Sequence, residues 1–235
     1  MTLRYLATAT LFAAAMLQAC GGGGSDSSTP APTVAPIASF PLLVGYKARI
    51  TAGATDNYTV SGTCAGNAVI TTSAATPATF EGINGFSATQ TATTNFTNCT
   101  PASAAVSGIS YFDTNLSLLG SSTPGVDYSK YAAAPPSLPA SVKVGDTAIF
   151  STLTVYANST KATVTGQRIL SYVIESDSTT TAIANLITKS YNTSGQLLFT
   201  QQSRYRVAAD GSLAVMSIDV QYSTTSSNRL VFTKA

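Results

Sequence analysis

Polar and apolar residues alternate along the C-terminal part of the chain, from Thr147 onward. A period of two is typical of a β-strand that buries one face. Runs rich in Thr, Val, Ile and Tyr are separated by Gly, Asn, Asp and Ser, which favour turns. The pattern predicts strands over Thr147 to Tyr156, Ala162 to Glu175, Thr180 to Tyr191, Leu197 to Val207, Leu213 to Tyr222 and Leu230 to Thr233.

The alternation is clearest in the run from Leu213 to Tyr222. Its predicted buried face carries Met216, Ile218, Val220 and Tyr222, and its predicted polar face carries Ser217, Asp219 and Gln221. Turn sequences stand at Asn192–Gly195 and at Asp210–Gly211. An Asp-Gly pair favours a hairpin because glycine tolerates a positive φ. We therefore expect these strands to form an antiparallel meander.

The first half of the folded region has a weaker β pattern, with turns rich in Gly, Asn and Pro. It predicts strands over Leu42 to Ile50, Tyr58 to Thr63, Ala68 to Thr72, Phe86 to Phe96 and Val106 to Phe112. The Pro-rich segment Pro135–Pro139 separates the β region 40–134 from the β region 140–235. This segment is either a domain linker or a crossing between two packed sheets, and we favour the crossing. The predicted fold class is all-β: an antiparallel meander or sandwich, or a partly closed barrel.

The N-terminus has the organisation of an export signal. One cation, Arg4, precedes an apolar run from Leu6 to Met16. This run is shorter than the roughly 20 residues that span a bilayer core, so it predicts a secretion signal and not a transmembrane helix. The stretch Leu17–Cys20 follows, and then Gly21–Ser25.

Leu17-Gln18-Ala19-Cys20 resembles the lipobox of bacterial lipoproteins, although Gln18 departs from the usual pattern. The resemblance implies that residues 1–19 are a signal peptide and that the Cys20 thiol receives a diacylglycerol. The new amino group is often acylated too, for example with palmitate. Because Gly21 and not Asp follows the cysteine, the resemblance implies the outer membrane, on its periplasmic or its surface face.

The alternative is an ordinary secretory signal that is cut after Ala13–Ala15. That cut would leave Cys20 as an unpaired third thiol in an oxidising compartment. In the lipoprotein interpretation, residues 20–39 are a Gly/Ser/Pro-rich tether, because Pro residues in its second half favour extended chain. The tether would hold the folded body away from the membrane.

Composition narrows the range of partners. Charged residues make up 9% of the chain, well below the roughly 25% of ordinary domains. Twelve Lys and Arg face ten Asp and Glu, and the signal peptide would remove one of these cations. Without a basic patch, nucleic acid is not an expected partner. The expected partner is the membrane, through the lipid, and a protein or glycan partner stays open.

Cys64 and Cys99 remain as a pair once Cys20 carries lipid. In an oxidising compartment two such thiols predict a structural disulfide. On the loop-entropy model the cross-link stabilises the fold by roughly 3–4 kcal/mol. A redox role is disfavoured because the closely spaced C-x-x-C motif is absent.

The chain contains no histidine, which excludes Ser-His-Asp and Cys-His nucleophile activation and every His-ligated metal site. The string Gly85–Thr89 approaches a G-x-S-x-G elbow but lacks its second glycine. Glu81 and Glu175 are the only glutamates, so an acid pair for glycoside hydrolysis stays formally open. Asp113–Asn115 and Asp56–Asn57 could ligate calcium, but turn formation is the favoured explanation. We expect no catalytic residue, metal or cofactor.

Two further groups are candidate binding residues. Arg204 and Arg206 share one face of a predicted strand and could bind an anion together with Lys189 or Arg168. Cross-strand pairing with Glu175 or Asp219 on a solvated face is the favoured alternative. Tyr111, Tyr128 and Tyr131 could form a sugar- or peptide-binding surface, although such tyrosines more often bury the ring and leave the hydroxyl in water.

The sequence thus predicts a non-enzymatic, lipid-anchored domain of the bacterial cell envelope that binds or scaffolds an unidentified ligand. Two alternatives stay open. One is a carboxylate-dependent envelope enzyme that acts on polysaccharide. The other is an adhesion or assembly subunit that engages another chain by adding a strand at a sheet edge.

Overall fold

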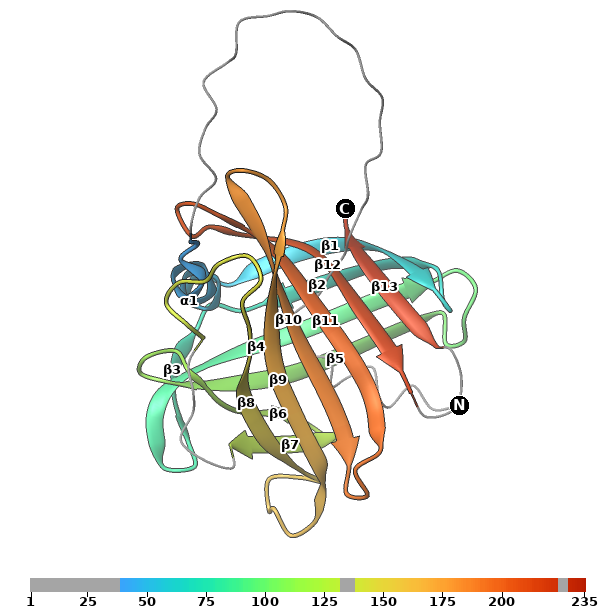
Figure 1. The fold of residues 1–235 in the computed structure, drawn as a ribbon. Helices are drawn as coiled ribbons and strands as arrows, with labels where there is room; N and C mark the ends of the chain where they lie inside the picture. The colour runs from blue at the N-terminus through green and yellow to red at the C-terminus, as the bar shows by residue number, and fades with distance from the viewer. Residues whose placement is uncertain (1–38, 132–137, 224–227) are drawn as a thin grey trace, which may run out of the picture.

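A computed structural model describes residues 39–131, 138–223 and 228–235, and contains one helix and thirteen strands (Figure 1). The elements are α1 (Leu42–Ala52), β1 (Ala54–Gly62), β2 (Gly66–Thr72), β3 (Thr76–Phe80), β4 (Ile83–Phe96), β5 (Ser103–Asp113), β6 (Leu118–Thr123), β7 (Asp127–Tyr131), β8 (Thr147–Tyr156), β9 (Val164–Ser176), β10 (Thr181–Asn192), β11 (Leu197–Ala208), β12 (Leu213–Tyr222) and β13 (Arg229–Lys234).

Twelve of the strands form a closed antiparallel barrel, so the all-β prediction is confirmed. From β4 to β13 each strand pairs with the next strand in the chain. Closure comes from two further pairings, in which β13 joins β1 and β2 joins β4. The short strand β3 also pairs with β4, beyond the end of β2, and stands outside the closed ring. Strands from both sides of the Pro-rich segment therefore belong to one barrel.

The predicted C-terminal meander is confirmed. Strands β8 to β13 lie side by side in chain order, and their bounds agree with the predicted runs to within two residues. Gly195 and Gly211 adopt a positive φ in the two predicted hairpins. In both turns an Asx side chain accepts backbone hydrogen bonds: Asn192 from Gln196, and Asp210 from Ser212. Local turn chemistry thus sets the register of this region.

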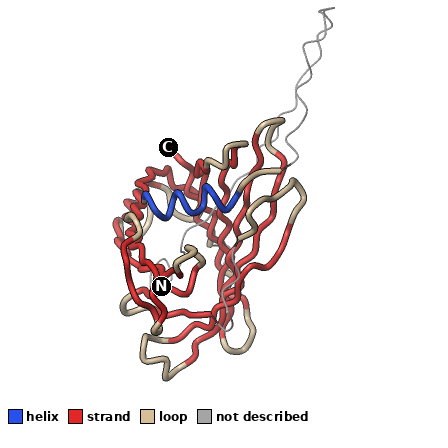
Figure 2. The backbone as a smooth tube through the Cα atoms, turned by 90° about the vertical axis from the view of Figure 1, so that its left-hand side faces the viewer, coloured by secondary structure: helices blue, strands red, loops and turns tan. Residues whose placement is uncertain are grey.

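The prediction of a strand over Leu42 to Ile50 is wrong, because these residues lie in α1. Leu42, Tyr46 and Ile50 are buried and follow one another at intervals of four, which places them on one helical face. The helix spans the barrel near one end (Figure 2). Gly45 fits there because a side chain at this position would collide with Gly211 in the β11–β12 turn.

Strands β3, β6 and β7 were not predicted from the sequence. They are only five or six residues long, and β3 contains Pro77. In β6, Gly120 lies so close to the Phe80 ring that a Cβ could not fit. Short strands rich in Ser, Thr and Gly show little hydrophobic alternation, so the period of two is lost.

Two apolar clusters fill the barrel. The first lies beneath α1, where Leu42 and Tyr46 pack with Ile174, Leu186 and Tyr205 on the barrel wall. The second lies at the other end, where β1, β2 and β11 to β13 meet, and includes Tyr58, Phe96, Phe199, Ile218 and Phe232. We call the two ends of the barrel the α1 end and the disulfide end.

The predicted faces of β12 are right for part of the strand. Ile218 and Val220 are buried in the second cluster and Tyr222 packs against it, as expected. Met216 is the exception, because a bulge makes Ser217 the partner of Arg204 and Val215 the partner of Tyr205. Ser217 stays on the predicted polar face, opposite Arg204, yet it is only 1% exposed. The change of phase applies to the residues before it, where Val215 instead of Met216 lies opposite Tyr205. A bulge adds one residue to a strand and so shifts the alternation, which the sequence pattern did not signal.

The segments 1–19 and 20–38, with Cys20, lie outside the described residues, as do residues 132–137 of the Pro-rich segment. The signal peptide, the lipid and most of the tether therefore stay predictions. Among the residues that the structure describes, no helix has the length and apolar character needed to cross a membrane.

Candidate functional site

A small cavity lies in the barrel lumen beneath α1. Its volume is about 50 Å³, and Tyr46 and Ile50 of the helix contribute to its wall. The apolar part of the wall comprises Ala88, Phe112, Leu118, Leu153 and Leu170. The polar part comprises Thr72, Gln90, Ser110, Ser121, Arg168 and Thr188. A mixed wall of this kind can hold a small molecule that has both apolar and hydrogen-bonding groups.

Alternation along the strands brings these side chains into the lumen. In β9, Arg168 is in phase with Leu170, Tyr172 and Ile174, which are all buried in the cluster beneath α1. In β7, Asp127 is in phase with Ser129, which is fully buried. The inward faces of β9 and β7 thus direct Arg168 and Asp127 toward each other across the inward face of β8.

Arg168 and Asp127 form an ion pair inside the barrel. Arg168 is 3% exposed, and its Nη2 donates a hydrogen bond to Oδ2 of Asp127. Arg168 Nε and Asp127 Oδ1 have no hydrogen-bond partner among the described residues. A buried polar atom without a partner costs roughly 1–3 kcal/mol, and more when the group is charged. The pair therefore retains one donor and one acceptor for water or a ligand.

Hydroxyl and amide groups share the lumen with Arg168. The Oγ atoms of Ser121 and Ser129 are 2.8 Å apart and share a hydrogen bond. Gln90 Nε2 donates to Thr72 Oγ1 at 3.4 Å, and both of these side chains line the cavity. The carbonyl oxygen of Gln90 and the serine and threonine hydroxyls supply further hydrogen-bond acceptors.

A charged clasp fastens α1 over the lumen, and we define it as Arg49, Asp56 and Lys234. Asp56 of β1 accepts hydrogen bonds from Arg49 of α1 and from Lys234 of β13, the latter at 2.9 Å. The Arg49 guanidinium also lies 5.7 Å from the centre of the Tyr205 ring, close enough for a cation–π interaction. Burial raises the pKa of Tyr205 and of Tyr46, so both phenols stay neutral at physiological pH.

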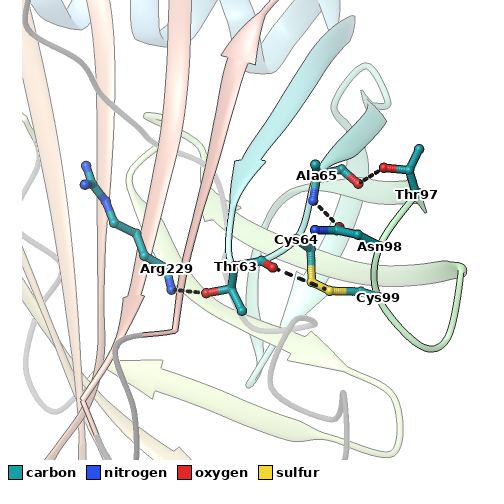
Figure 3. Close-up of a disulfide and its surroundings, with 7 residues drawn as sticks. All are labelled: Thr63, Cys64, Ala65, Thr97, Asn98, Cys99 and Arg229. Atoms are coloured by element: carbon teal, nitrogen blue, oxygen red, sulfur yellow. Dashed lines mark hydrogen bonds between the residues drawn. A yellow bond between two sulfur atoms is a disulfide. The ribbon is translucent and has the colours of Figure 1, made fainter.

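The predicted disulfide between Cys64 and Cys99 is present, with a Cα–Cα distance of 5.7 Å. It joins the β1–β2 turn to the loop between β4 and β5 (Figure 3). Beside it, the Ala65 amide donates to Asn98 Oδ1, and Thr97 Oγ1 donates to the Ala65 carbonyl. The Arg229 amide donates to Thr63 Oγ1, which ties the same turn to β13. The bridge therefore staples the place where the barrel closes.

The two arginines proposed as an anion site lie on the face of β11 that points away from the lumen, and each has an acidic partner. Arg204 Nη2 donates to Glu175 Oε1 at 3.1 Å, and Arg206 Nε donates to Asp177 Oδ2 at 2.6 Å. Arg168 cannot join them, because it faces the lumen. Cross-strand pairing is confirmed for Arg204 with Glu175, whereas Asp219 pairs with Arg229. The expectation of a solvated face is wrong at Arg204, which is only 8% exposed.

The three candidate tyrosines do not form one open surface. Tyr111 and Tyr128 stack on Phe80, with ring centres 4.5 and 5.5 Å from the Phe80 ring. Tyr131 instead lines a second cavity of about 10 Å³, where burial raises its pKa to about 12. The stacked rings hold the β3–β4 hairpin against the outside of the barrel.

The acidic candidates have structural partners. Glu81 accepts hydrogen bonds from Tyr128, Lys130 and Lys161. Asp113 accepts the backbone N–H groups of the turn that follows it, as the turn explanation expects. Within the described ranges, no group of three or more acidic or cysteine side chains is placed to hold a metal ion.

Sequence reasoning missed the lumen pair, although one signal for it was available. The predicted anion site includes Arg168 beside Arg204 and Arg206, yet the period of two places Arg168 on the apolar face of its own strand. A cation in phase with Leu170, Tyr172 and Ile174 must have a buried partner. That partner, Asp127, lies in a strand that the pattern did not reveal.

Comparison with protein-family models, with curated proteins and with solved structures gave no significant match.

Proposed function

We propose that the protein is a non-enzymatic binding module of the bacterial cell envelope, anchored by lipid at Cys20, and that it binds a small ligand in the lumen of its barrel. The observation that carries the proposal is the half-satisfied Arg168–Asp127 pair beside a cavity. A barrel that served only as a scaffold would gain stability from a fully apolar interior, since a buried ion pair is weak evidence for stability.

The position of α1 relates the lumen to the proposed anchor. Phe40 pairs with Val142 immediately before α1, so residues 20–39 would join the barrel at the α1 end. Lys234, next to the C-terminal residue, is held at the same end by the clasp. A lipid at Cys20 would therefore be connected to the barrel through its α1 end. Two or three acyl chains suffice for stable anchoring, because each buried methylene contributes about 0.8 kcal/mol.

The binding part of the proposal is tested by methyl NMR with a library of small fragments. Leu153 and Leu170 line the cavity and report on the lumen, whereas Ile149 and Val164 are exposed and serve as controls. We expect at least one fragment to shift the lumen methyls in a saturable way while the control methyls stay unchanged. Shifts confined to exposed methyls, or none at all, would refute a lumen site.

The anchor is tested separately in a bacterial host fed an alkyne-tagged palmitate. The wild-type chain should take up the label and fractionate with membranes. The Cys20→Ser variant should carry no label and remain an unprocessed precursor. An unmodified mature N-terminus near Met16 in the intact mass of the wild-type protein would refute lipid attachment.

A further inference from the structure

The charges at the lumen cavity cancel. Arg168 is the one side chain among the described cavity residues that carries a charge at neutral pH, and Asp127 compensates it. Tyr46 also lines the cavity, but burial raises the pKa of its phenol and keeps it neutral. The charged clasp involves Arg49, Asp56 and Lys234, none of which lines the cavity. The cavity thus offers polarity without net charge.

From this we infer that the lumen selects a small neutral ligand with an amide-like group, and rejects carboxylates of the same shape. The inference rests on the proposed function, and it names the chemical class of ligand for that site. The Arg168 guanidinium can donate from Nε to a carbonyl oxygen, and Gln90 and the Ser110, Ser121 and Thr188 hydroxyls can accept from an N–H group. An amide supplies both partners at once.

A carboxylate is disfavoured for two physical reasons. It would bring a second negative charge near Asp127, and Arg168 already compensates only one such charge. It would also lose its hydration, and the desolvation of an ion in a protein interior costs several kcal/mol unless an opposite charge repays it. A carboxylate has no donor for the acceptors on the cavity wall, whereas an amide has two.

The cavity volume limits the size of the group that enters. By volume, about 50 Å³ accommodates roughly three or four water molecules. A group of about four non-hydrogen atoms therefore fits without movement of α1. Acetamide and acetate have this size and nearly the same shape, but they differ in charge, which makes them a matched pair of probes.

The test titrates each probe into the full chain at pH 7, followed by the Leu153 and Leu170 methyl signals. So small a ligand binds weakly, at about the millimolar level, because its few atoms limit the binding free energy. We expect acetamide to bind the lumen at least about tenfold more tightly than acetate. Equal affinity, tighter binding of acetate, or lumen binding by other fragments but by neither probe would overturn the inference and leave the proposed function standing. If no fragment of any kind reaches the lumen, the proposed function falls as well, and the cavity holds water only.

Two variants test whether the ion pair causes the preference for acetamide over acetate. Asp127→Asn leaves the Arg168 cation uncompensated, so acetate should gain at least about tenfold in affinity and the preference should reverse. The double variant Arg168→Met with Asp127→Leu replaces the pair by apolar groups, a change that folded proteins often tolerate. It should keep the fold and lose the preference for acetamide. If acetate gains nothing in Asp127→Asn, and acetamide keeps its advantage in the double variant, the ion pair does not set the selectivity.

Discussion

Two regions of the barrel wall are built in different ways. In the meander from β8 to β13 each strand pairs with its neighbour in the chain, and four-residue turns connect β9 to β10, β10 to β11 and β11 to β12. The closing region, which comprises β1, β2 and β4, includes the pairing of β1 with β13, which joins residues far apart in the chain, such as Tyr58 with Lys234. Long-range pairing costs more chain entropy before it yields any contact. The comparison explains why the closing region carries extra fastenings.

These fastenings lie at the two ends of β1. Cys64 follows the strand and joins the β4–β5 loop at the disulfide end. Asp56, near the start of the strand, holds Arg49 of α1 and Lys234 of β13 at the α1 end. Strand β1, which pairs with β2 and with β13, is thus held by a disulfide at one end and by ion pairs at the other. The meander has a continuous row of sequential hairpins instead.

The largest effect is expected from a charge in the core of the meander. Ile218 is 6% exposed and belongs to the second apolar cluster, so Ile218→Asp would bury an unpaired carboxylate. We expect a loss of about 4 kcal/mol or more in the free energy of unfolding. The matched control is Ile149→Asp on β8, where the side chain is 66% exposed and the change should be nearly silent. Denaturant unfolding followed by circular dichroism measures both, and equal losses would show that the register of β12 is wrong.

The second largest effect is expected when the disulfide of the closing region is removed. Replacing both cysteines, Cys64→Ser with Cys99→Ser, should lower the stability by about 3–4 kcal/mol, because the open chain gains entropy when unfolded. Hydrogen exchange should accelerate more in β1 and β2 than in β9 and β10, since local opening follows the weakest region. Uniform acceleration across all of the strands would show that the two regions open as one unit.

The same contrast governs what the sequence could predict. Period-two alternation and Asx–Gly turns located β8 to β13 closely, because these signals are local. The sequence pattern predicts a strand over Leu42 to Ile50, although the burial of Leu42, Tyr46 and Ile50 follows a helical period. The closure of β13 onto β1 leaves no local signal, and neither does the bulge at Met216. The pairing of Cys64 with Cys99 was predictable by counting, whereas the pairing of Arg168 with Asp127 required the unpredicted strand β7.

A smaller effect is expected when the charged clasp at the start of β1 is broken. Asp56→Asn leaves Arg49 and Lys234 without their shared carboxylate, and both cations are partly exposed and can recover hydration. We expect a loss of about 2 kcal/mol, below the 3–5 kcal/mol typical of a fully buried pair. Asp177→Asn is the matched control, because its partner Arg206 is largely solvated and such surface pairs contribute about 1 kcal/mol or less. If the two variants lose the same stability, the clasp is no more than a surface pair.

The smallest effect concerns the β3–β4 hairpin, which lies outside both regions and depends on side chains for its attachment. Hydrogen bonds from Lys161 and Tyr128 lower the pKa of Glu81 from 4.5 to about 2. The stabilisation from ionised Glu81 is therefore complete above pH 4.5, and it is lost as the pH falls toward 2. The wild type should exceed Glu81→Gln by no more than about 1 kcal/mol at pH 7, and the difference should shrink below pH 4.5. Unfolding midpoints measured between pH 7 and pH 2.5 follow it. In a double-mutant cycle with Lys161→Met, the double variant should lose less stability than the two single variants lose together, because both substitutions remove the same interaction. A difference that stays constant down to pH 2.5 would show that Glu81 does not hold the hairpin through its charge.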